Sequence, residues 1–128
     1  MRLLLDTHAL LWWAGGARQL SHPARAAIGD ETNTVFVSAA SAWEIATKHR
    51  LGKLDAAGPL LDGLMPYLDD QDFRDLAIGV RHAQQAGALP GPHRDPFDRM
   101  LIAQALIEGL TLVSREALFD RYGVQRRW

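Results

Sequence analysis

The sequence predicts an α/β fold in which a twisted parallel sheet of four to five strands is flanked by helices in three layers. Short apolar or β-branched runs alternate with longer segments of helical character along almost the whole chain. Parallel strands need a crossover between them, which is usually a helix. The first run, Leu3–Leu5, is wholly apolar and ends at an acid, as in a strand buried on both faces of such a sheet.

Four segments are the expected strands, three of them apolar or β-branched runs, and the tail of the chain can add one more. Thr34–Ser38 combines β-branched and aromatic residues, which favour strands. The expected strands, in chain order, are Leu3–Leu5, Thr34–Ser38, Phe73–Ile78 and Thr111–Ser114.

Helices are expected between these strands, most of them with a start or a stop signal. Gly15-Gly16 ends the first helix, Ser21 with Pro23 begins the second, and either Ser38 or Ser41 caps the third. The loop Leu89–Arg94 precedes the most regular helix, which Gly109 ends. The expected helices are Thr7–Ala14, Ser21–Gly29, a helix from the capping serine to Arg50, Pro59–Leu68, Gly79–Ala86, Pro96–Glu108 and Arg115–Phe119.

Length and composition narrow the class of protein. A chain of 128 residues has the size of one ordinary domain, so residues 1–128 are expected to form a single domain. The absence of cysteine excludes disulfides, thiolate catalysis and sulfur-ligated zinc, and fits a reducing cytosol. The longest apolar run, Ala9–Ala14, is far shorter than the roughly 20 residues of a membrane helix. We therefore expect a soluble cytoplasmic protein that binds no membrane.

Net charge alone does not decide whether the partner is a nucleic acid. The formal charge of −1 and the pI of about 6.5 are close to neutral, whereas proteins that contact many phosphates are usually basic. This near-neutral net charge is the sum of an acidic stretch and a basic last third of the chain. The acids are Asp69, Asp70, Asp72 and Asp75, and the arginines are Arg94, Arg99, Arg115, Arg121, Arg126 and Arg127.

Two acids that lie near strand ends each have a structural and a functional interpretation. Asp6 directly follows the first strand, where it can be a helix N-cap, a role that Thr7 could also fill. Glu44 matches a capping box with Ser41 and an i,i+4 pair with Lys48. Both acids are also candidates for a site at the carboxyl edge of the sheet.

Asp98 and Glu116 are the other two candidates. Asp98 leads the apolar face of its helix, where a buried carboxylate needs a partner such as Arg94, Arg99 or a metal ion. Glu116 follows the fourth strand, and it could simply be a first-turn acid favoured by the helix dipole.

The neighbouring acid Asp95 is expected to act on stability rather than chemistry. Pro96 is best placed at the first helical position, which makes Asp95 the N-cap. Asp98 is then the third helical residue and projects along the apolar face toward the sheet edge.

Together the four acids predict a site for a hard divalent cation. Two like charges about 4 Å apart repel by about 4 kcal/mol at an effective dielectric constant near 20. Such a cluster therefore holds protons with raised pKa values or binds a cation. Oxygen ligands select Mg²⁺ or Mn²⁺ over zinc. Carboxylates with such an ion and no protein nucleophile suggest phosphodiester hydrolysis.

Four segments resemble VapC-like PIN domains in the same order and at similar spacing: LLLDTHALLWW, SAASAWEIATKHRLGKL, HRDPFDRMLIAQA and LVSREALFDRYGV. The resemblance covers nearly the whole chain and implies a PIN-like three-layer fold. It implies a ribonuclease for single-stranded RNA with four acids around one or two Mg²⁺ or Mn²⁺ ions, and a toxin that dimerises and is blocked by a VapB-like antitoxin.

The resemblance also implies roles for individual residues. The four acids fall on Asp6, Glu44, Asp98 and Glu116, with the first three as direct metal ligands. The family usually has Asp at the last position, so the longer Glu116 is expected to act less directly. Thr7, Asp95 and Ser114 are expected beside the site in secondary or structural roles, and Arg94, Arg99 and Arg115 as RNA contacts.

Two other functions remain open at this stage. An aspartyl phosphatase also has Asp after its first strand, but its D-x-D-x-T pattern needs an acid where His8 stands. A non-catalytic binding module would use tryptophans as an interface. We expect Trp43 to be at least partly in the core. Trp12 and Trp13 cannot both face inward, because neighbours on a helix lie about 100° apart, so one is a candidate for a dimer or antitoxin contact.

Overall fold

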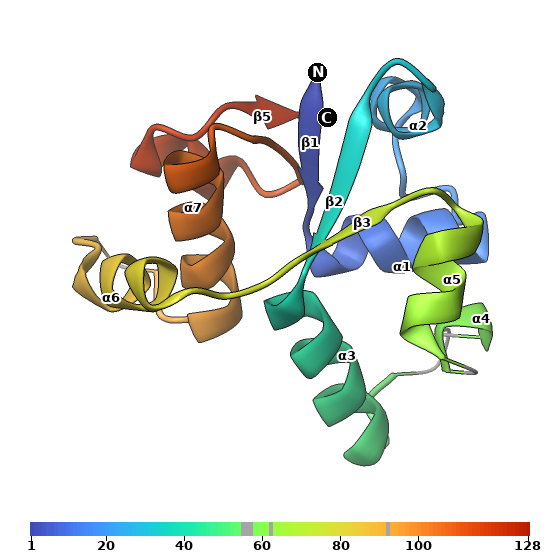
Figure 1. The fold of residues 1–128 in the computed structure, drawn as a ribbon, viewed down its shortest axis with the longest axis horizontal. Coiled ribbons are helices and arrows are strands. Elements are labelled where there is room, and N and C mark those ends of the chain that lie inside the picture. The colour runs from blue at the N-terminus through green and yellow to red at the C-terminus, as the bar shows by residue number, and fades with distance from the viewer. Residues whose placement is uncertain (55–57, 62, 92) are drawn as a thin grey trace.

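The computed structural model describes the chain except for residues 55–57, 62 and 92. The described residues form one sheet with helices around it (Figure 1). Its strands are β1 (Arg2–Leu5), β2 (Thr34–Ser38), β3 (Arg74–Leu76), β4 (Thr111–Val113) and β5 (Arg126–Arg127). The helices are α1 (Thr7–Gly15), α2 (His22–Gly29), α3 (Ala39–Arg50), α4 (Gly58–Leu61), α5 (Leu64–Asp70), α6 (Val80–Ala88), α7 (Pro96–Glu108) and the 3₁₀ helix η1 (Ala117–Tyr122).

The sheet has five strands in the order β3-β2-β1-β4-β5, and each neighbouring pair is parallel. The chain builds from β1 outward to β3, and then crosses to the other side of β1 for β4 and β5. The predicted α/β class with a parallel sheet is confirmed, and the tail does add the fifth strand. Both termini lie at the end of the sheet away from α3 (Figure 1).

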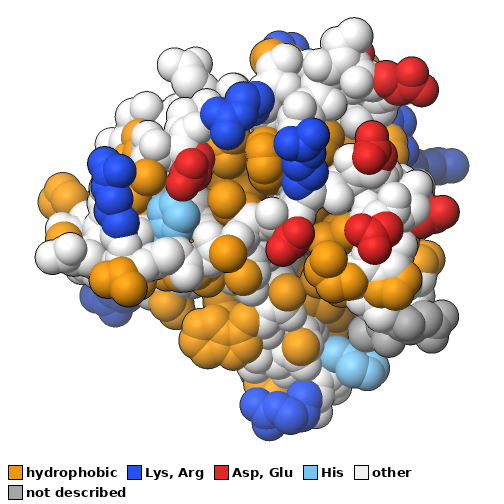
Figure 2. All heavy atoms as spheres, viewed as in Figure 1, with side chains coloured by type: hydrophobic (Ala, Val, Ile, Leu, Met, Phe, Trp, Pro, Cys, Tyr) orange, Lys and Arg blue, Asp and Glu red, His pale blue; other side chains and the backbone are white. Residues whose placement is uncertain are grey.

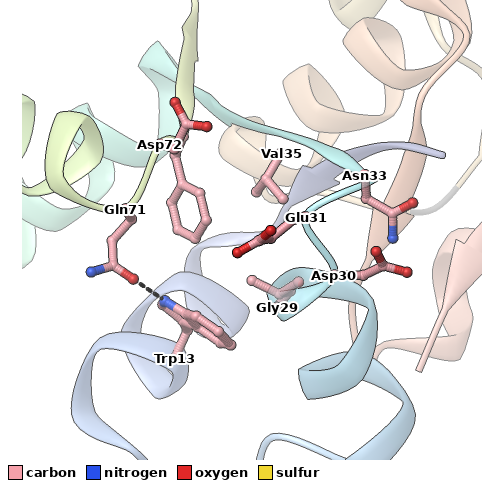
Figure 3. Close-up of a pocket in the computed structure, with 10 residues that line it drawn as sticks. Trp13, Gly29, Asp30, Glu31, Asn33, Val35, Gln71 and Asp72 are labelled. Carbon is pink, nitrogen blue, oxygen red and sulfur yellow. Dashed lines mark hydrogen bonds between the residues drawn. The ribbon is translucent and has the colours of Figure 1, made fainter.

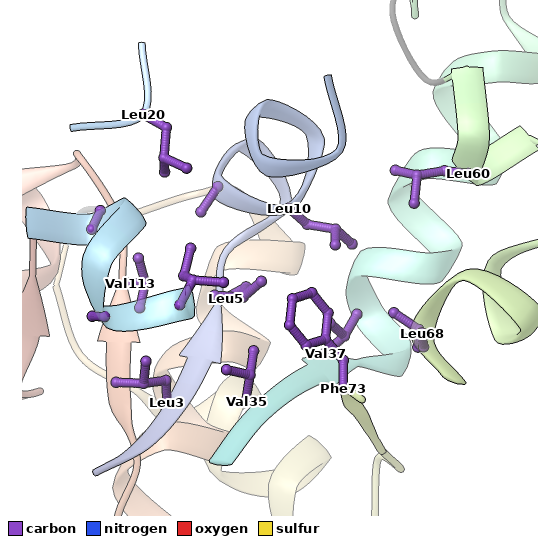
Figure 4. Packing of buried hydrophobic residues seen from close by; sticks show 14 of the residues in the cluster. Leu3, Leu5, Leu10, Leu20, Val35, Val37, Leu60, Leu68, Phe73 and Val113 are labelled. Carbon is purple, nitrogen blue, oxygen red and sulfur yellow. The ribbon is translucent and has the colours of Figure 1, made fainter. Parts of the chain in front are cut away.

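Helices cover both faces of the sheet because successive strand residues point to opposite sides. Leu3 and Leu5 of β1 belong to a buried cluster with residues of α1, α2 and α5 (Figure 4). Leu4 points the other way and packs with Leu101 and Ile102 of α7. β1 is thus buried on both faces, as the run Leu3–Leu5 predicts. Helix α3 leaves the carboxyl end of β2, projects beyond the sheet and contacts α7 (Figure 1).

Three elements differ from the sequence expectation by more than one or two residues in length, or in type. The single helix expected over Pro59–Leu68 is replaced by α4 and α5, and its residue 62 lies outside the described part of the chain. Gly63 interrupts it, because its φ of 130° is incompatible with a helix. The third strand is shorter than Phe73–Ile78, and the helix expected over Arg115–Phe119 is the 3₁₀ helix η1.

Charge is unevenly distributed over the surface. Figure 2 shows acidic side chains gathered on the side of α5 and β3, where Asp69, Asp70, Asp72 and Asp75 are exposed. Lysine and arginine side chains lie over the other parts of this face. In the described part of the chain, no helix is both long enough and apolar enough to span a membrane.

Candidate active site

The carboxyl ends of β1 and β4 flank the point at which the strand order reverses. β1 pairs with β2 on one side and with β4 on the other. In open parallel sheets, ligands bind in the crevice at such a point, beyond the carboxyl ends of the strands. Asp6 directly follows β1 there, and Ser114 directly follows β4.

A pocket of about 130 Å³ at this edge brings all four predicted acids together. Asp6 leads into α1, Glu44 lies on α3, Asp98 on α7, and Glu116 precedes η1. The remaining residues that line the pocket are Thr7, His8, Lys48, His93, Asp95 and Leu118. Acids separated by up to 110 positions in the sequence therefore share one small volume.

Asp6 is both an N-cap and a member of the pocket. Its Oδ1 accepts a hydrogen bond from the backbone N–H of Ala9 at 2.7 Å, which fixes the start of α1. Only 4% of Asp6 is exposed. Burial raises the pKa of its carboxyl, although hydrogen bonds from Ser114 and Ala9 act in the opposite direction. The capping role of Asp6 does not exclude a role in the site, because the same carboxyl caps α1 and lines the pocket.

Glu44 is buried despite lying outside the apolar stripe of its helix. Ser38 caps α3 by accepting from Ala40 N at 3.0 Å. The predicted capping box of Ser41 with Glu44 is wrong, because the Ser41 hydroxyl instead accepts from Thr7 at 3.1 Å, which ties α3 to α1. The predicted pair with Lys48 is present, with Nζ 2.7 Å from the Glu44 carboxylate.

The two acids of HRDPFDR separate as the helix register predicts. Asp95 is the N-cap of α7, and its Oδ1 accepts from Phe97 N at 2.8 Å and from Asp98 N at 3.2 Å. The side chain of Asp98 remains 26% exposed to the pocket. Its partner is neither Arg94 nor Arg99 but His93, whose Nε2 lies 3.0 Å from Asp98 Oδ2.

The neighbouring acids destabilise the charged form of Asp98. Its pKa is raised to about 7, first by burial and then by the negative charges of Asp95, Glu44, Asp6 and Glu116. A cation bound nearby would stabilise the charged form of this carboxyl.

Glu116 lines the exposed side of the pocket, and Ser114 lies buried beside it. The buried Ser114 hydroxyl accepts from Glu116 N at 3.0 Å. Arg126 of β5 donates to the carbonyl of Ser114 at 3.1 Å and pairs with Asp120 at 2.8 Å. Glu116 itself is exposed, unlike Asp6 and Glu44.

The donor set fits a hard divalent cation in its chemistry. The four predicted acids line the pocket, and burial together with repulsion between the acids raises the pKa values of Asp98 and Asp6. Among the described residues, however, no three acids or histidines already converge on one point that could hold a metal ion. Glu44 is engaged by Lys48 and Asp98 by His93. Each of these contacts occupies one oxygen of the carboxylate, Oε2 of Glu44 and Oδ2 of Asp98.

The three arginine candidates have different environments. Arg99 does not fit its expected role as an RNA contact, because its guanidinium donates to the carbonyls of Ala86, His93 and Leu89. It holds the loop before α7 in place. Arg94 and Arg115 are exposed, and the Arg115 guanidinium lies 4.7 Å from the centre of the Trp12 ring.

The tryptophans are placed differently from the expectation. Trp43 is 65% exposed rather than in the core, because α3 projects beyond the sheet, and its ring meets only the edge of Phe97 at 5.0 Å. Hydrophobic side chains are visible at the surface beside the start of α7 (Figure 2). Trp12 and Trp13 are both half-buried, against Trp128 and Phe73 respectively. The exposed aromatic surface is therefore that of Trp43.

A larger pocket, of about 540 Å³, lies between the turn before β2 and the turn before β3, away from the four acids (Figure 3). Trp13 donates its indole N–H to Gln71 at 2.9 Å, and Asp30 accepts from the backbone and hydroxyl of Thr32. This pocket lies at the amino ends of the strands, where parallel sheets do not usually bind their ligands. We therefore place the chemistry in the smaller pocket.

Sequence reasoning missed four pocket residues: His8, Lys48, His93 and Leu118. The i,i+4 spacing from Glu44 did signal Lys48, but only as a partner within the helix. His93 lies in a loop, where no periodicity indicates the direction of a side chain.

Comparison with known folds agrees with this geometry. The chain is similar to the crystal structure of VapBC2 from Rickettsia felis bound to a DNA fragment from their promoter, with a TM-score of 0.71 and 16% identity over 98% of this chain and 97% of that one. It is also similar to FitAcB from Neisseria gonorrhoeae, with a TM-score of 0.63 and 22% identity over 97% and 95% of the two chains. A domain of a functionally unknown protein from Methanocaldococcus jannaschii gives a TM-score of 0.59 and 16% identity over 98% and 88%.

At these identities the likeness to solved structures establishes the fold alone. No curated protein matches the chain in sequence. The family model described as the PIN domain matches residues 3–125, which is almost the whole chain. That match, with the parallel sheet and the acidic pocket at its carboxyl edge, means that the chain belongs to the PIN domain family.

Proposed function

We propose that this PIN domain is an endoribonuclease that cuts single-stranded RNA and depends on Mg²⁺, for which Mn²⁺ can substitute. The observation that carries the proposal is the pocket shared by Asp6, Glu44, Asp98 and Glu116. Carboxylate oxygens are the ligands that Mg²⁺ and Mn²⁺ prefer. Hydrolysis of a phosphodiester with such an ion needs no nucleophile from the protein.

Each pocket residue has a role in this proposal. Asp6, Glu44 and Asp98 hold the cation, which when bound supplies an activated water and stabilises negative charge on the phosphate oxygens. Asp98 would have to be in its carboxylate form to hold the cation, because metal ligands must be deprotonated. Glu116, at the exposed side, orients water rather than contacting the ion directly. Lys48 brings a positive charge to the pocket, where it can meet a phosphate oxygen.

RNA binding would rely on cations outside the pocket as well. Arg94 precedes the N-cap of α7, and Arg115 lies between Ser114 and Glu116. Both are exposed and both adjoin pocket residues. Contacts with phosphates release counterions, so RNA affinity is expected to fall as the salt concentration rises.

The proposal is tested by incubating purified protein with labelled single-stranded RNA, and with DNA of the same sequence, in Mn²⁺, in Mg²⁺ and in EDTA. The expected result is cleavage of the RNA with either ion and none in EDTA. Asp98→Asn should lose the cleavage while keeping its circular dichroism spectrum. If total cellular RNA stays intact at every protein and metal concentration, the nuclease proposal is wrong. Cleavage that persists in EDTA or in Asp98→Asn would point to a contaminant.

The biological role that fits best is the toxin of a toxin–antitoxin pair with a VapB-like antitoxin, acting as a cytoplasmic homodimer. The similar structures are named as VapBC2 and FitAcB, and one contains promoter DNA. The exposed Trp43, with Phe97 beside it, offers an apolar surface that a protein partner could cover.

Two measurements test this role. Light scattering after size-exclusion chromatography should give the mass of a dimer. Expression of the chain alone should arrest growth, and co-expression with the product of a short adjacent gene should restore it. Growth that is unaffected by the active chain would contradict the toxin role without contradicting the nuclease.

A further inference from the structure

His93 lines the acidic pocket, and both its side chain and its backbone contact neighbouring residues. Its Nε2 lies 3.0 Å from Asp98 Oδ2, and its side chain is 14% exposed. The imidazole ring lies 5.9 Å from the Phe119 ring and 6.4 Å from the Tyr122 ring, centre to centre. The ring is thus enclosed on its far side by aromatic residues and meets a carboxylate on its pocket side.

The backbone of His93 is held from two directions. Its N–H donates to the Tyr122 hydroxyl at 3.0 Å, and its carbonyl accepts from Arg99 Nη1 at 2.9 Å. Arg99 also binds the carbonyls of Ala86 and Leu89, so one guanidinium fixes the end of α6 and the loop that follows it. The bonds from Arg99 and the bond from His93 to Tyr122 therefore fix the backbone position of His93.

Gly91 shows that the loop is built closely around Tyr122. A Cβ at this position would lie 2.8 Å from the Tyr122 hydroxyl oxygen, and the φ of Gly91 is +102°. Both features exclude a larger side chain without movement of the loop. The tyrosine, the glycine and the arginine therefore act together to place His93 against Asp98.

We propose that His93 is a positioning residue for the metal site, holding one oxygen of Asp98 so that the other faces the pocket. The inference rests on the proposed function, because Asp98 must be a metal ligand for its orientation to matter. A carboxylate that is already oriented loses less side-chain freedom when a cation binds. Partners of this kind, one step removed from the ion, typically change metal affinity 10- to 100-fold when they are mutated.

The chain contains a matched control in His82. Its Nε2 lies 2.9 Å from Glu108 Oε1, and it is similarly buried, with a side-chain exposure of 9%. His82 lies on α6 and Glu108 at the end of α7, and neither lines the acidic pocket. Only the His93 contact involves a carboxylate of the pocket, whereas His82 also accepts from Gly79 N at 2.9 Å at the start of α6.

The experiment is a calorimetric titration of Mn²⁺ into the intact wild-type protein, His93→Ala, His93→Gln and His82→Ala, with unfolding curves for all four in EDTA. His93→Ala is expected to bind Mn²⁺ 10- to 100-fold more weakly. His93→Gln should recover part of that loss, because its amide N–H₂ can reach the position of Nε2. His82→Ala should bind Mn²⁺ as the wild type does, even if its unfolding midpoint falls.

Tyr122→Phe provides a second route if His93→Ala does not fold. It removes the hydroxyl that holds the His93 N–H and leaves every pocket side chain in place. A weaker Mn²⁺ affinity is again expected, smaller than that of His93→Ala.

Three outcomes would overturn the inference, and they can be told apart from failure of the proposed function. Equal Mn²⁺ affinity in wild type and His93→Ala means that the contact is only structural. Tighter binding in His93→Ala means that His93 competes with the cation. An equal loss in His82→Ala means that the effect is one of general stability. If the wild type itself binds no Mn²⁺, the proposed metal-dependent function fails, and the inference fails with it.

Discussion

Asp98 has a pKa of about 7 in a protein without bound cation, and this has a consequence for stability. The ordinary pKa of an aspartate in the unfolded chain is about 3.9. A pKa that is raised by folding means that the folded protein holds the proton more tightly. The associated stability is fully present below about pH 4 and is lost as the pH rises through about 7.

The difference in unfolding free energy between wild type and Asp98→Asn should therefore change with pH. In EDTA, Asp98→Asn should gain stability relative to the wild type between pH 4 and pH 8, because the amide never becomes charged. Urea unfolding of both proteins at several pH values measures the difference, and titrating groups that do not interact with Asp98 cancel in it. A difference that stays constant over this range would mean that Asp98 is not crowded by the neighbouring acids.

Of the four acids, Glu116 should be the one whose replacement reduces RNA cleavage least. It is exposed, whereas Asp6 and Glu44 are buried, and its longer side chain fixes an oxygen less firmly. In the RNA cleavage assay, Glu116→Gln should keep more activity than Asp6→Asn or Asp98→Asn. An equal loss in all three would show that Glu116 contacts the cation directly.

At the scale of the element, the start of α7 carries two acids with different roles: Asp95 stabilises the helix, and Asp98 belongs to the proposed cation site. Asp95 accepts from two backbone N–H groups of the first turn, and Asp98 reaches the pocket one residue after Phe97. Asp95→Ala should lower the free energy of unfolding by about 0.5–2 kcal/mol, the usual cost of a lost cap. Asp95→Asn should cost much less, because its side-chain oxygen still accepts.

Unfolding and cleavage are measured side by side for Asp95→Ala, Asp95→Asn and Asp98→Asn. Asp95 also raises the pKa of Asp98, so removal of its charge offsets part of the lost cap in metal-free protein. We expect Asp95→Asn to fold and cleave RNA and Asp98→Asn to fold and be inactive. An Asp95→Asn protein that is folded but as inactive as Asp98→Asn would place Asp95 among the essential pocket residues.

The sequence predicted the order of strands and helices along the chain because β1, β2 and β4 are apolar or β-branched runs and most helices have a cap or a glycine stop. It predicted one helix where Gly63 divides two, since a glycine within a helical pattern does not reveal its φ angle. It placed Trp43 in the core on the general behaviour of tryptophan, and only the projection of α3 beyond the sheet makes this residue exposed.

At the scale of the whole molecule, the site depends on contacts that local patterns do not contain. The convergence of the four acids followed from strand ends meeting at one edge of a parallel sheet, and for that reason it could be predicted. The roles of Arg99 and His93 depend on how the loop before α7 folds back toward η1. No periodicity in residues 89–95 encodes that path, so Arg99 was taken for an RNA contact and His93 was missed.

The central claim is that acids from four separate parts of the chain form a single cation site. The most direct measurement is the melting temperature with increasing Mn²⁺, for the wild type and for Asp6→Asn/Asp98→Asn. A ligand at 100 times its dissociation constant adds about 2.7 kcal/mol to the free energy of unfolding, so the wild type should melt several degrees higher in saturating Mn²⁺. The double variant should show none of that gain. A wild-type melting temperature that does not change with Mn²⁺ or Mg²⁺, or a double variant stabilised as much as the wild type, would contradict the account.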